Sequence, residues 1–225
     1  MLQLLRRGFR SLIQPLLWIG YRRYLSKSRW YHHDGLHINV LPSVFHPGIF
    51  FSTKIMMRHI KALPIAGKRV LELGAGSGMV ALAARRASAL VTASDINPEA
   101  LQAIEASAQR NGLDVRLLHS DLFDKIAPQP FDYILINPPY FPKDPSSDQE
   151  YAFYCGSDFG YFHRLFGQLG HYLSPAGCAL MILSDDCEVE RIQRMARESG
   201  LEMELVYREW VWGEVNFIFR IPSPS

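Results

Sequence analysis

The stretch that decides the fold is Val70-Leu71-Glu72-Leu73-Gly74-Ala75-Gly76-Ser77-Gly78, which predicts a buried strand, a glycine-rich turn and the start of a helix. Glycines allow a tight turn and let a ligand approach the backbone, and a helix N-terminus favours an anionic group. In the nicotinamide-type pattern G-x-G-x-x-G counted from Gly74, the third glycine would stand where Met79 is found. The pattern E-x-G-x-G-x-G therefore favours a different ligand-binding turn, with a purely structural turn as the alternative.

Strand and helix patterns alternate from residue 68 onward, which predicts a parallel sheet covered on both faces. The predicted strands are 69–73, 90–94, 115–119, 133–136 and 179–183, and the predicted helices are 79–87, 98–109, 161–172 and 188–199. Two more strand-like runs, 203–211 and 215–221, are joined at Trp212-Gly213-Glu214 without a helix, which predicts a hairpin. We therefore expect an α/β protein with a seven-stranded, mostly parallel sheet and one antiparallel strand from the C-terminal hairpin.

The N-terminal third divides into two zones. Residues 34–64 predict a short strand at 36–40 and a helix at about 52–63. Residues 1–33 form a predicted basic amphipathic arm, because seven Lys and Arg residues precede the first acidic residue, Asp34. The predicted domains are thus 1–33, the arm, and 34–225, the catalytic domain. The arm could follow an RNA backbone, lie on an anionic membrane surface, or pack on the domain with its basic side in solvent.

The composition favours a cytoplasmic protein. The apolar run at 11–21 is too short to span a bilayer, and no signal-peptide cleavage site follows it. Three cysteines without metal-ligand spacing are typical of reduced, buried thiols, and the net charge of +2 is too small to indicate a nucleic-acid coat by itself. The adjacent pair His32-His33 would face opposite ways on an extended chain, so we expect no metal site.

Two acidic residues end strands of the predicted sheet. Asp95 follows the glycine turn by roughly twenty residues, the usual distance of a carboxylate that binds a ribose. The alternative is that Asp95 caps the next helix, but Asn97 can do that as well. Asp121, after the third strand, could receive the exocyclic amine of an adenine ring, because ligands bind beyond the carboxyl ends of such strands.

The fourth strand closes with Asn137-Pro138-Pro139-Tyr140. The prolines stiffen the turn and leave the Pro138 carbonyl free to accept a hydrogen bond, and the Asn137 amide oxygen is a second acceptor. Tyr140 provides a flat face for stacking. Together these groups could grip an NH2 group through both hydrogens; an ordinary Pro-Pro turn with a core aromatic residue is the alternative.

With these motifs, residues 44–221 resemble the class I S-adenosylmethionine-dependent methyltransferases, and within them the Asn-Pro-Pro-Tyr group. That group includes methyltransferases of release-factor glutamine, adenine N6, cytosine N4 and ribosomal-RNA guanine N2. The resemblance implies a Rossmann-like fold and S-adenosylmethionine as the cofactor. It implies that the cofactor-binding residues are Thr53, Glu72, Gly74, Gly76, Gly78, Asp95, Ile96, Asp121, Leu122 and Asn137. It implies that the catalytic residues are Asn137, Pro138 and Tyr140.

The sequence therefore predicts an N-methyltransferase that acts on a planar amino nitrogen of a protein glutamine or an RNA base. Its expected partners are RNA or a translation-related protein, with no metal. The alternatives are methylation of a small molecule or of protein lysine, a cofactor-binding module without catalysis, and a nicotinamide-dependent oxidoreductase, which Met79 disfavours. Only about thirty residues precede the domain, so recognition through a large N-terminal helical domain is not expected.

Overall fold

The computed structural model describes residues 27–42, 44, 47–48, 51–146 and 150–224. Most of the predicted basic arm, residues 1–26, lies outside these described residues. Among the described residues, no helix has both the length and the apolar character needed to cross a membrane.

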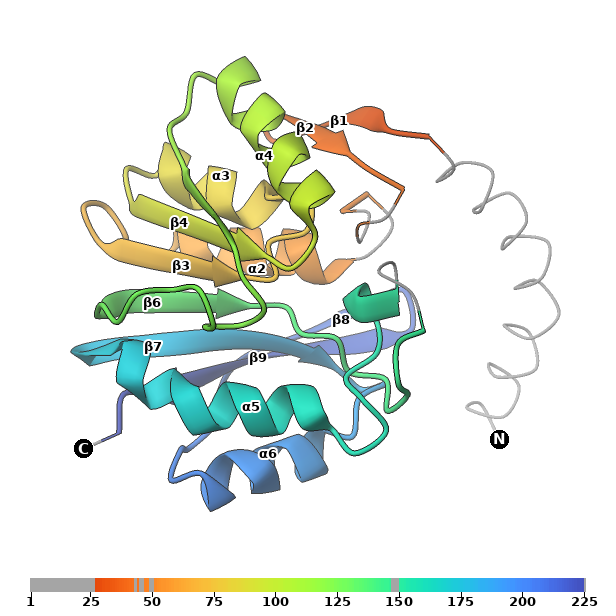
Figure 1. Ribbon diagram of the computed structural model, residues 1–225, viewed down its shortest axis with the longest axis vertical. Coiled ribbons are helices and arrows are strands. Elements are labelled where there is room, and N and C mark those ends of the chain that lie inside the picture. Colours follow the sequence, from red (N-terminus) through yellow and green to blue (C-terminus); the bar gives the residue numbers. More distant parts are fainter. Residues whose placement is uncertain (1–26, 43, 45–46, 49–50, 147–149, 225) are drawn as a thin grey trace, which may run out of the picture.

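A seven-stranded sheet forms the centre of the molecule, with the strand order β5-β4-β3-β6-β7-β9-β8 (Figure 1). Its strands are β3 (Arg69–Leu73), β4 (Leu90–Asp95), β5 (Arg116–His119), β6 (Phe131–Ile136), β7 (Leu173–Ser184), β8 (Glu204–Val211) and β9 (Glu214–Pro222). The pairs among β5, β4, β3, β6 and β7 are parallel, whereas β9 runs antiparallel to both β7 and β8. The predicted sheet with one antiparallel strand from a C-terminal hairpin is confirmed.

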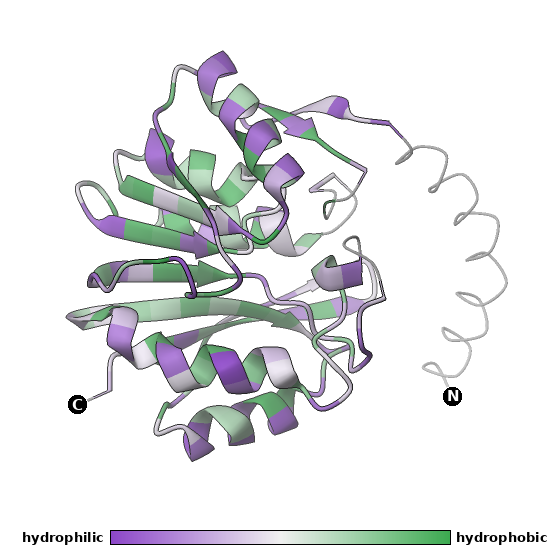
Figure 2. Ribbon diagram, in the orientation of Figure 1, coloured by the Kyte–Doolittle hydropathy of each residue, from purple (hydrophilic) through white to green (hydrophobic). Residues whose placement is uncertain are grey.

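Helices cover both faces of this sheet (Figure 1). One face carries α2 (Phe51–Lys61), α3 (Met79–Arg86) and α4 (Pro98–Arg110), and the other carries α5 (Gly160–Leu169) and α6 (Val189–Glu198). Within β7, Leu180 and Ile182 pack toward the first face, whereas Met181 and Leu183 pack toward the second. This double burial explains why the central strands are mostly apolar, as the hydropathy colours of Figure 2 show.

A two-stranded hairpin precedes the helices of the domain. Strands β1 (Arg29–His33) and β2 (Leu36–Val40) pair as a hairpin, so position 33 lies at its turn and the last residues assigned to the arm are part of the fold. The backbone N–H of Asn39 in β2 donates to the hydroxyl of Ser107 in α4 at 2.9 Å. The mostly exposed side chains of β1 lack a clear alternation, which explains why its sequence did not predict a strand.

The parallel register brings four strand ends to one edge of the sheet. Leu73 of β3 pairs with Ser94 of β4 and with Ile136 of β6, and Asp95 pairs with His119 of β5. The segments after these strands therefore meet at this edge, which is where the predicted site residues stand.

Candidate functional site

A pocket of about 410 Å³ opens at the carboxyl edge of the parallel strands. Eleven of the twelve predicted site residues line it, namely Thr53, Glu72, Gly74, Gly76, Asp95, Ile96, Asp121, Leu122, Asn137, Pro138 and Tyr140. Residues predicted from five separate stretches of sequence thus share one cavity.

The glycine turn forms one wall of the pocket. Gly74 and Gly76 have φ angles of 65° and 51°, in the left-handed region that favours glycine. A Cβ atom built on Gly74 would meet no heavy atom within 4 Å, so the backbone there faces open space. A ligand can approach this turn closely, as its sequence predicts.

Gly78 differs from its neighbours, because it is not among the residues that line the pocket. It precedes α3 with a φ of 69°, and a Cβ atom there would lie 2.6 Å from Cγ1 of Ile104 in α4. The structure therefore explains the glycine at position 78 by packing, because a residue without a Cβ atom allows the close approach of the turn to α4.

Glu72 is a buried carboxyl group behind the glycine turn. Its Oε2 accepts a hydrogen bond of 2.7 Å from the backbone N–H of Ala81 in α3. Burial raises the pKa of Glu72 to about 8, the Ala81 hydrogen bond opposes this shift, and nearby Asp95 adds to it. The carboxyl group is therefore poised to ionise when a cationic group enters the pocket.

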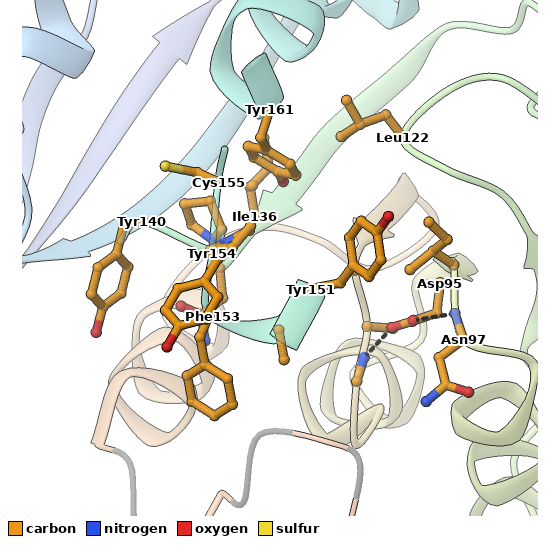
Figure 3. Close-up of a pocket in the computed structure, with 18 of the residues that line it drawn as sticks. Asp95, Asn97, Leu122, Ile136, Tyr140, Tyr151, Phe153, Tyr154, Cys155 and Tyr161 are labelled. Atoms are coloured by element: carbon orange, nitrogen blue, oxygen red, sulfur yellow. Dashed lines mark hydrogen bonds between the residues drawn. The ribbon is translucent and has the colours of Figure 1, made fainter. Parts of the chain in front are cut away.

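Asp95 is held rigidly at the end of β4. One of its oxygens accepts from the Gly76 N–H at 2.7 Å and the other accepts from the Asn97 N–H at 2.8 Å (Figure 3). Burial raises the pKa of Asp95, and these backbone hydrogen bonds oppose the shift. Asn97 caps α4 by accepting from the Glu99 N–H at 2.9 Å, which confirms it as the predicted helix cap.

Asp121 forms an ion pair with a residue that no sequence motif indicates. Arg164 of α5 donates to Oδ2 of Asp121 at 2.7 Å and to Oδ2 of Asp124 at 3.2 Å, and it lines the pocket. Leu122, which follows Asp121 in the sequence, is buried and has a φ of 46°. Arg164 lies 43 residues from Asp121, so no local sequence signal could have indicated this pair.

Asn137, Pro138 and Tyr140 form the predicted substrate clamp, which presents two hydrogen-bond acceptors to the pocket. Nδ2 of Asn137 donates to Oγ of Ser52 in α2 at 3.2 Å, which sets the amide so that Oδ1 is the remaining acceptor. The buried Pro138 also lines the cavity, and no group among the described residues donates to its carbonyl oxygen. Ser52 was not predicted, although its neighbour Thr53 was.

Tyr140 lies at the opposite end of the pocket view from Asp95 (Figure 3). Burial raises the pKa of its phenol, nearby Cys187 adds to the shift, and a hydrogen bond with Ser184 opposes it. The phenol is therefore neutral at physiological pH. Its ring centroid lies 4.8 Å from that of Phe141.

An aromatic segment after the clamp completes the pocket and was also missed. It includes the short 3-10 helix η1 (Glu150–Ala152) and adds Tyr151, Phe153, Tyr154 and Cys155 to the lining, to which α5 adds Tyr161 (Figure 3). The N–H of Phe141 donates to the Phe153 carbonyl at 3.0 Å, and that of Cys155 donates to the Phe141 carbonyl at 3.0 Å. The aromatic run 151–154 is the sequence feature that could have indicated this part of the pocket.

Within the described parts of the chain, no three His, Cys, Asp or Glu residues are grouped to hold a metal.

Comparison with known proteins gives a consistent result. The model of the methyltransferase small domain family matches residues 35–199. A Methanocaldococcus jannaschii protein assigned as a protein N5-glutamine methyltransferase is 28% identical over 182 residues, covering 78% of this chain and 89% of the relative. The release factor glutamine methyltransferase of Deinococcus radiodurans is 33% identical over 61% of this chain, which spans only 52% of that relative. A tRNA adenine-N6 methyltransferase of Shewanella loihica is 32% identical over 61% of both chains.

The fold is also found among solved structures. The Thermus thermophilus 16S rRNA N2 methyltransferase, solved with S-adenosylmethionine and guanosine, aligns with a TM-score of 0.62 and 18% identity. The alignment covers 88% of this chain and 50% of the Thermus chain, so the likeness shows a shared Rossmann-like fold.

Proposed function

The chain belongs to the methyltransferase small domain family, and from this premise we propose that its pocket methylates a planar amino nitrogen of a macromolecule. It is an S-adenosylmethionine-dependent methyltransferase, as the sequence predicts. The relatives described above are named as methyltransferases of glutamine and of adenine N6, and both of these acceptors are conjugated NH2 groups.

The residues present fit S-adenosylmethionine. The left-handed backbone at Gly74 faces open space, which suits the close approach of an amino-acid moiety. In this proposal the buried Glu72 favours the cationic end of the cofactor, Asp95 accepts hydrogen bonds from its ribose, and Thr53 contacts it from α2. Ile96, Asp121 and Leu122 border the adenine, and Arg164 holds Asp121 in place through their ion pair.

The proposal rests on two hydrogen-bond acceptors at the end of β6 that receive no hydrogen bond from the described residues. Oδ1 of Asn137 and the Pro138 carbonyl both belong to pocket residues and have no protein donor among the described residues. An NH2 group has two hydrogens to donate, so it matches this pair, whereas a hydroxyl group has only one.

These acceptors could also assist the reaction. S-adenosylmethionine supplies an electrophilic methyl group on a sulfonium sulfur. The lone pair of an amide or aryl amine is delocalised, so the nitrogen is a poor nucleophile. Hydrogen bonds to Asn137 and Pro138 hold the nitrogen in line and favour tetrahedral character as it reacts, so catalysis rests on positioning and electrostatics. Tyr140 borders the conjugated plane of the acceptor.

Two measurements test this function. Calorimetry should show binding of S-adenosylhomocysteine and no binding of NADH; the reverse would indicate an oxidoreductase. Radiolabelled methyl groups should then be transferred from S-adenosylmethionine into the protein or RNA fraction of a cell extract. Cofactor binding without transfer to any macromolecule would favour a binding module or a small-molecule methyltransferase. The role of the basic residues at the N-terminus stays a prediction.

A further inference from the structure

The turn between β8 and β9 stands at the same edge of the sheet as the clamp. Ile136, the last residue of β6, pairs with Met181, and β7 continues for three more residues to Ser184, which pairs with Asn216 of β9. The turn therefore extends past the end of β6. The Asp185 N–H donates to the Val215 carbonyl at 2.9 Å, which ties the loop after β7 to the hairpin.

The hairpin formed by β8 and β9 lies close to Tyr140 of the clamp. The phenol of Tyr140 is hydrogen-bonded to Ser184, and Asp186 and Glu214 lie near enough to influence its pKa. A substrate that reaches the clamp with one residue can thus contact the hairpin with residues close by in its own chain.

The turn and the end of β8 that leads into it expose large aromatic side chains. Trp212 is 83% exposed and Trp210 is 58% exposed. The φ of Trp212 is 49°, a backbone conformation that residues other than glycine rarely adopt. On the pocket itself, Tyr151 and Phe141 are 46% and 39% exposed. Exposed aromatic groups at the edge of the sheet that carries the pocket are typical of a surface that binds a partner.

Several basic groups around this surface are held in ion pairs, whereas the exposed Arg208 of β8 forms no ion pair with the described residues. Arg164 pairs with Asp121 and Asp124, Lys143 pairs with Glu150, and Arg58 pairs with Glu209. Residues 27–225 contain 19 Lys and Arg against 22 Asp and Glu, a formal net charge of −3, because the five remaining basic residues lie in 1–26. Nucleic-acid binding depends on cationic groups that are available to phosphates, so this surface is a poor match for RNA.

The acidic side chains beside the turn differ from these paired basic groups, because they form no ion pair with the described residues. Asp185 and Asp186 are exposed, and neither forms an ion pair with a basic side chain of the described residues. An aromatic face next to carboxylates suits a Lys or Arg side chain, which the ring attracts through its π-system and the carboxylates through charge. Charge complementarity therefore favours a polypeptide that carries basic residues.

We propose that the turn 211–214, with Asp185 and Asp186, is the docking surface of a polypeptide acceptor, whose basic side chain lies against Trp212 while its amide enters the clamp. This inference rests on the proposed function and narrows its acceptor to protein. The hairpin then determines the affinity for the acceptor and has no part in cofactor binding.

The test compares the full chain with the double variant Trp212→Ala/Asp186→Asn in methyl transfer to separated protein and RNA fractions of a cell extract. The matched control is Trp30→Ala, which removes an exposed tryptophan from β1. We expect label in the protein fraction, an initial rate about tenfold lower for the double variant at limiting acceptor, and an unchanged rate for the control. Affinity for S-adenosylhomocysteine should be the same in all three proteins.

Label found in the RNA fraction, or a double variant as fast as the control, would overturn the docking inference and leave the methyltransferase itself standing. Failure of the unchanged protein to bind S-adenosylhomocysteine would instead overturn the proposed function and the inference with it. A direct binding measurement adds a second readout. Hexa-arginine should quench tryptophan fluorescence of the full chain and not that of the double variant, whereas a single-stranded RNA decamer should have no such selective effect.

Discussion

The side-chain amide of Asn137 donates a hydrogen bond to the hydroxyl oxygen of Ser52 at 3.2 Å, across 85 residues of sequence. This contact joins the start of α2 to the end of β6. Because an amide has one donor end and one acceptor end, holding the NH2 end at Ser52 determines where Oδ1 lies. The acceptor oxygen proposed to grip the substrate is thus oriented by a residue of a different element.

Ser52→Ala should lower kcat about fivefold, since a hydrogen bond of about 1 kcal/mol no longer favours one orientation of the amide. The affinity for S-adenosylhomocysteine should stay the same. The control uses Asn137→Asp, which has an acceptor oxygen on both sides of the carboxylate. In that background Ser52→Ala should have little further effect on kcat, and equal losses in both backgrounds would show that Ser52 has a different role.

Gly78→Ala should destabilise the fold much more than Gly67→Ala. Both glycines have a positive φ, but only at Gly78 would a Cβ atom collide, at 2.6 Å from Ile104. We expect losses in the free energy of unfolding of about 3 kcal/mol for Gly78→Ala and about 1 kcal/mol for Gly67→Ala, measured by urea denaturation. Equal losses would mean that the packing of the turn against α4 is looser than the structure shows.

Asp95→Asn should weaken binding of S-adenosylhomocysteine by about tenfold or more, because it replaces one of two acceptor oxygens by an NH2 group that cannot accept from the ribose. Asp132→Asn is the matched control. Asp132 also accepts a backbone hydrogen bond, from Arg69 at 2.8 Å, but it lies at the start of β6, away from the pocket. Calorimetry that gave the same affinity for both variants would remove Asp95 from the cofactor site.

The buried Glu72 predicts a pH dependence of stability. Its pKa is about 8 in the folded protein and 4.5 when exposed, so the folded state holds its proton more tightly. The stability from this group is fully present below pH 4.5 and is lost as the pH rises through about 8. Urea denaturation should therefore show a smaller free energy of unfolding at pH 8 than at pH 5. Glu72→Gln should remove most of this slope, and an unchanged slope would place its origin elsewhere.

Much of the sheet could be predicted because its strands are buried on both faces. Such strands are short apolar runs bounded by turns, and the prediction of 69–73 coincides with β3 (Arg69–Leu73). The largest difference between a predicted and an observed strand is at β7 (Leu173–Ser184). The sequence predicts this strand only from residue 179, because Pro175 and Gly177 interrupt its apolar pattern. The site residues at the strand ends followed from the same topology, since parallel strands gather their carboxyl ends at one edge.

The rest of the pocket depends on contacts between distant parts of the chain. Neither Ser52 nor Arg164 belongs to a motif, and each acquires its place only when α2 and α5 pack on the sheet. Tyr151 reaches the pocket through backbone hydrogen bonds between the segments around Phe141 and Phe153. Spacing in the sequence cannot indicate such pairings. At Gly78 the structure adds a packing contact with Ile104 that the motif does not indicate, and its predicted contact with the cofactor stays a prediction.

The most direct test of the central claim is the rate of methyl transfer by Asn137→Ala, measured with radiolabelled S-adenosylmethionine and cell extract alongside calorimetric binding of S-adenosylhomocysteine. If Asn137 and Pro138 grip the acceptor nitrogen, the rate should fall by about 100-fold or more while cofactor affinity is preserved. A variant that transfers methyl groups at nearly the rate of the unchanged protein would contradict this account of the site.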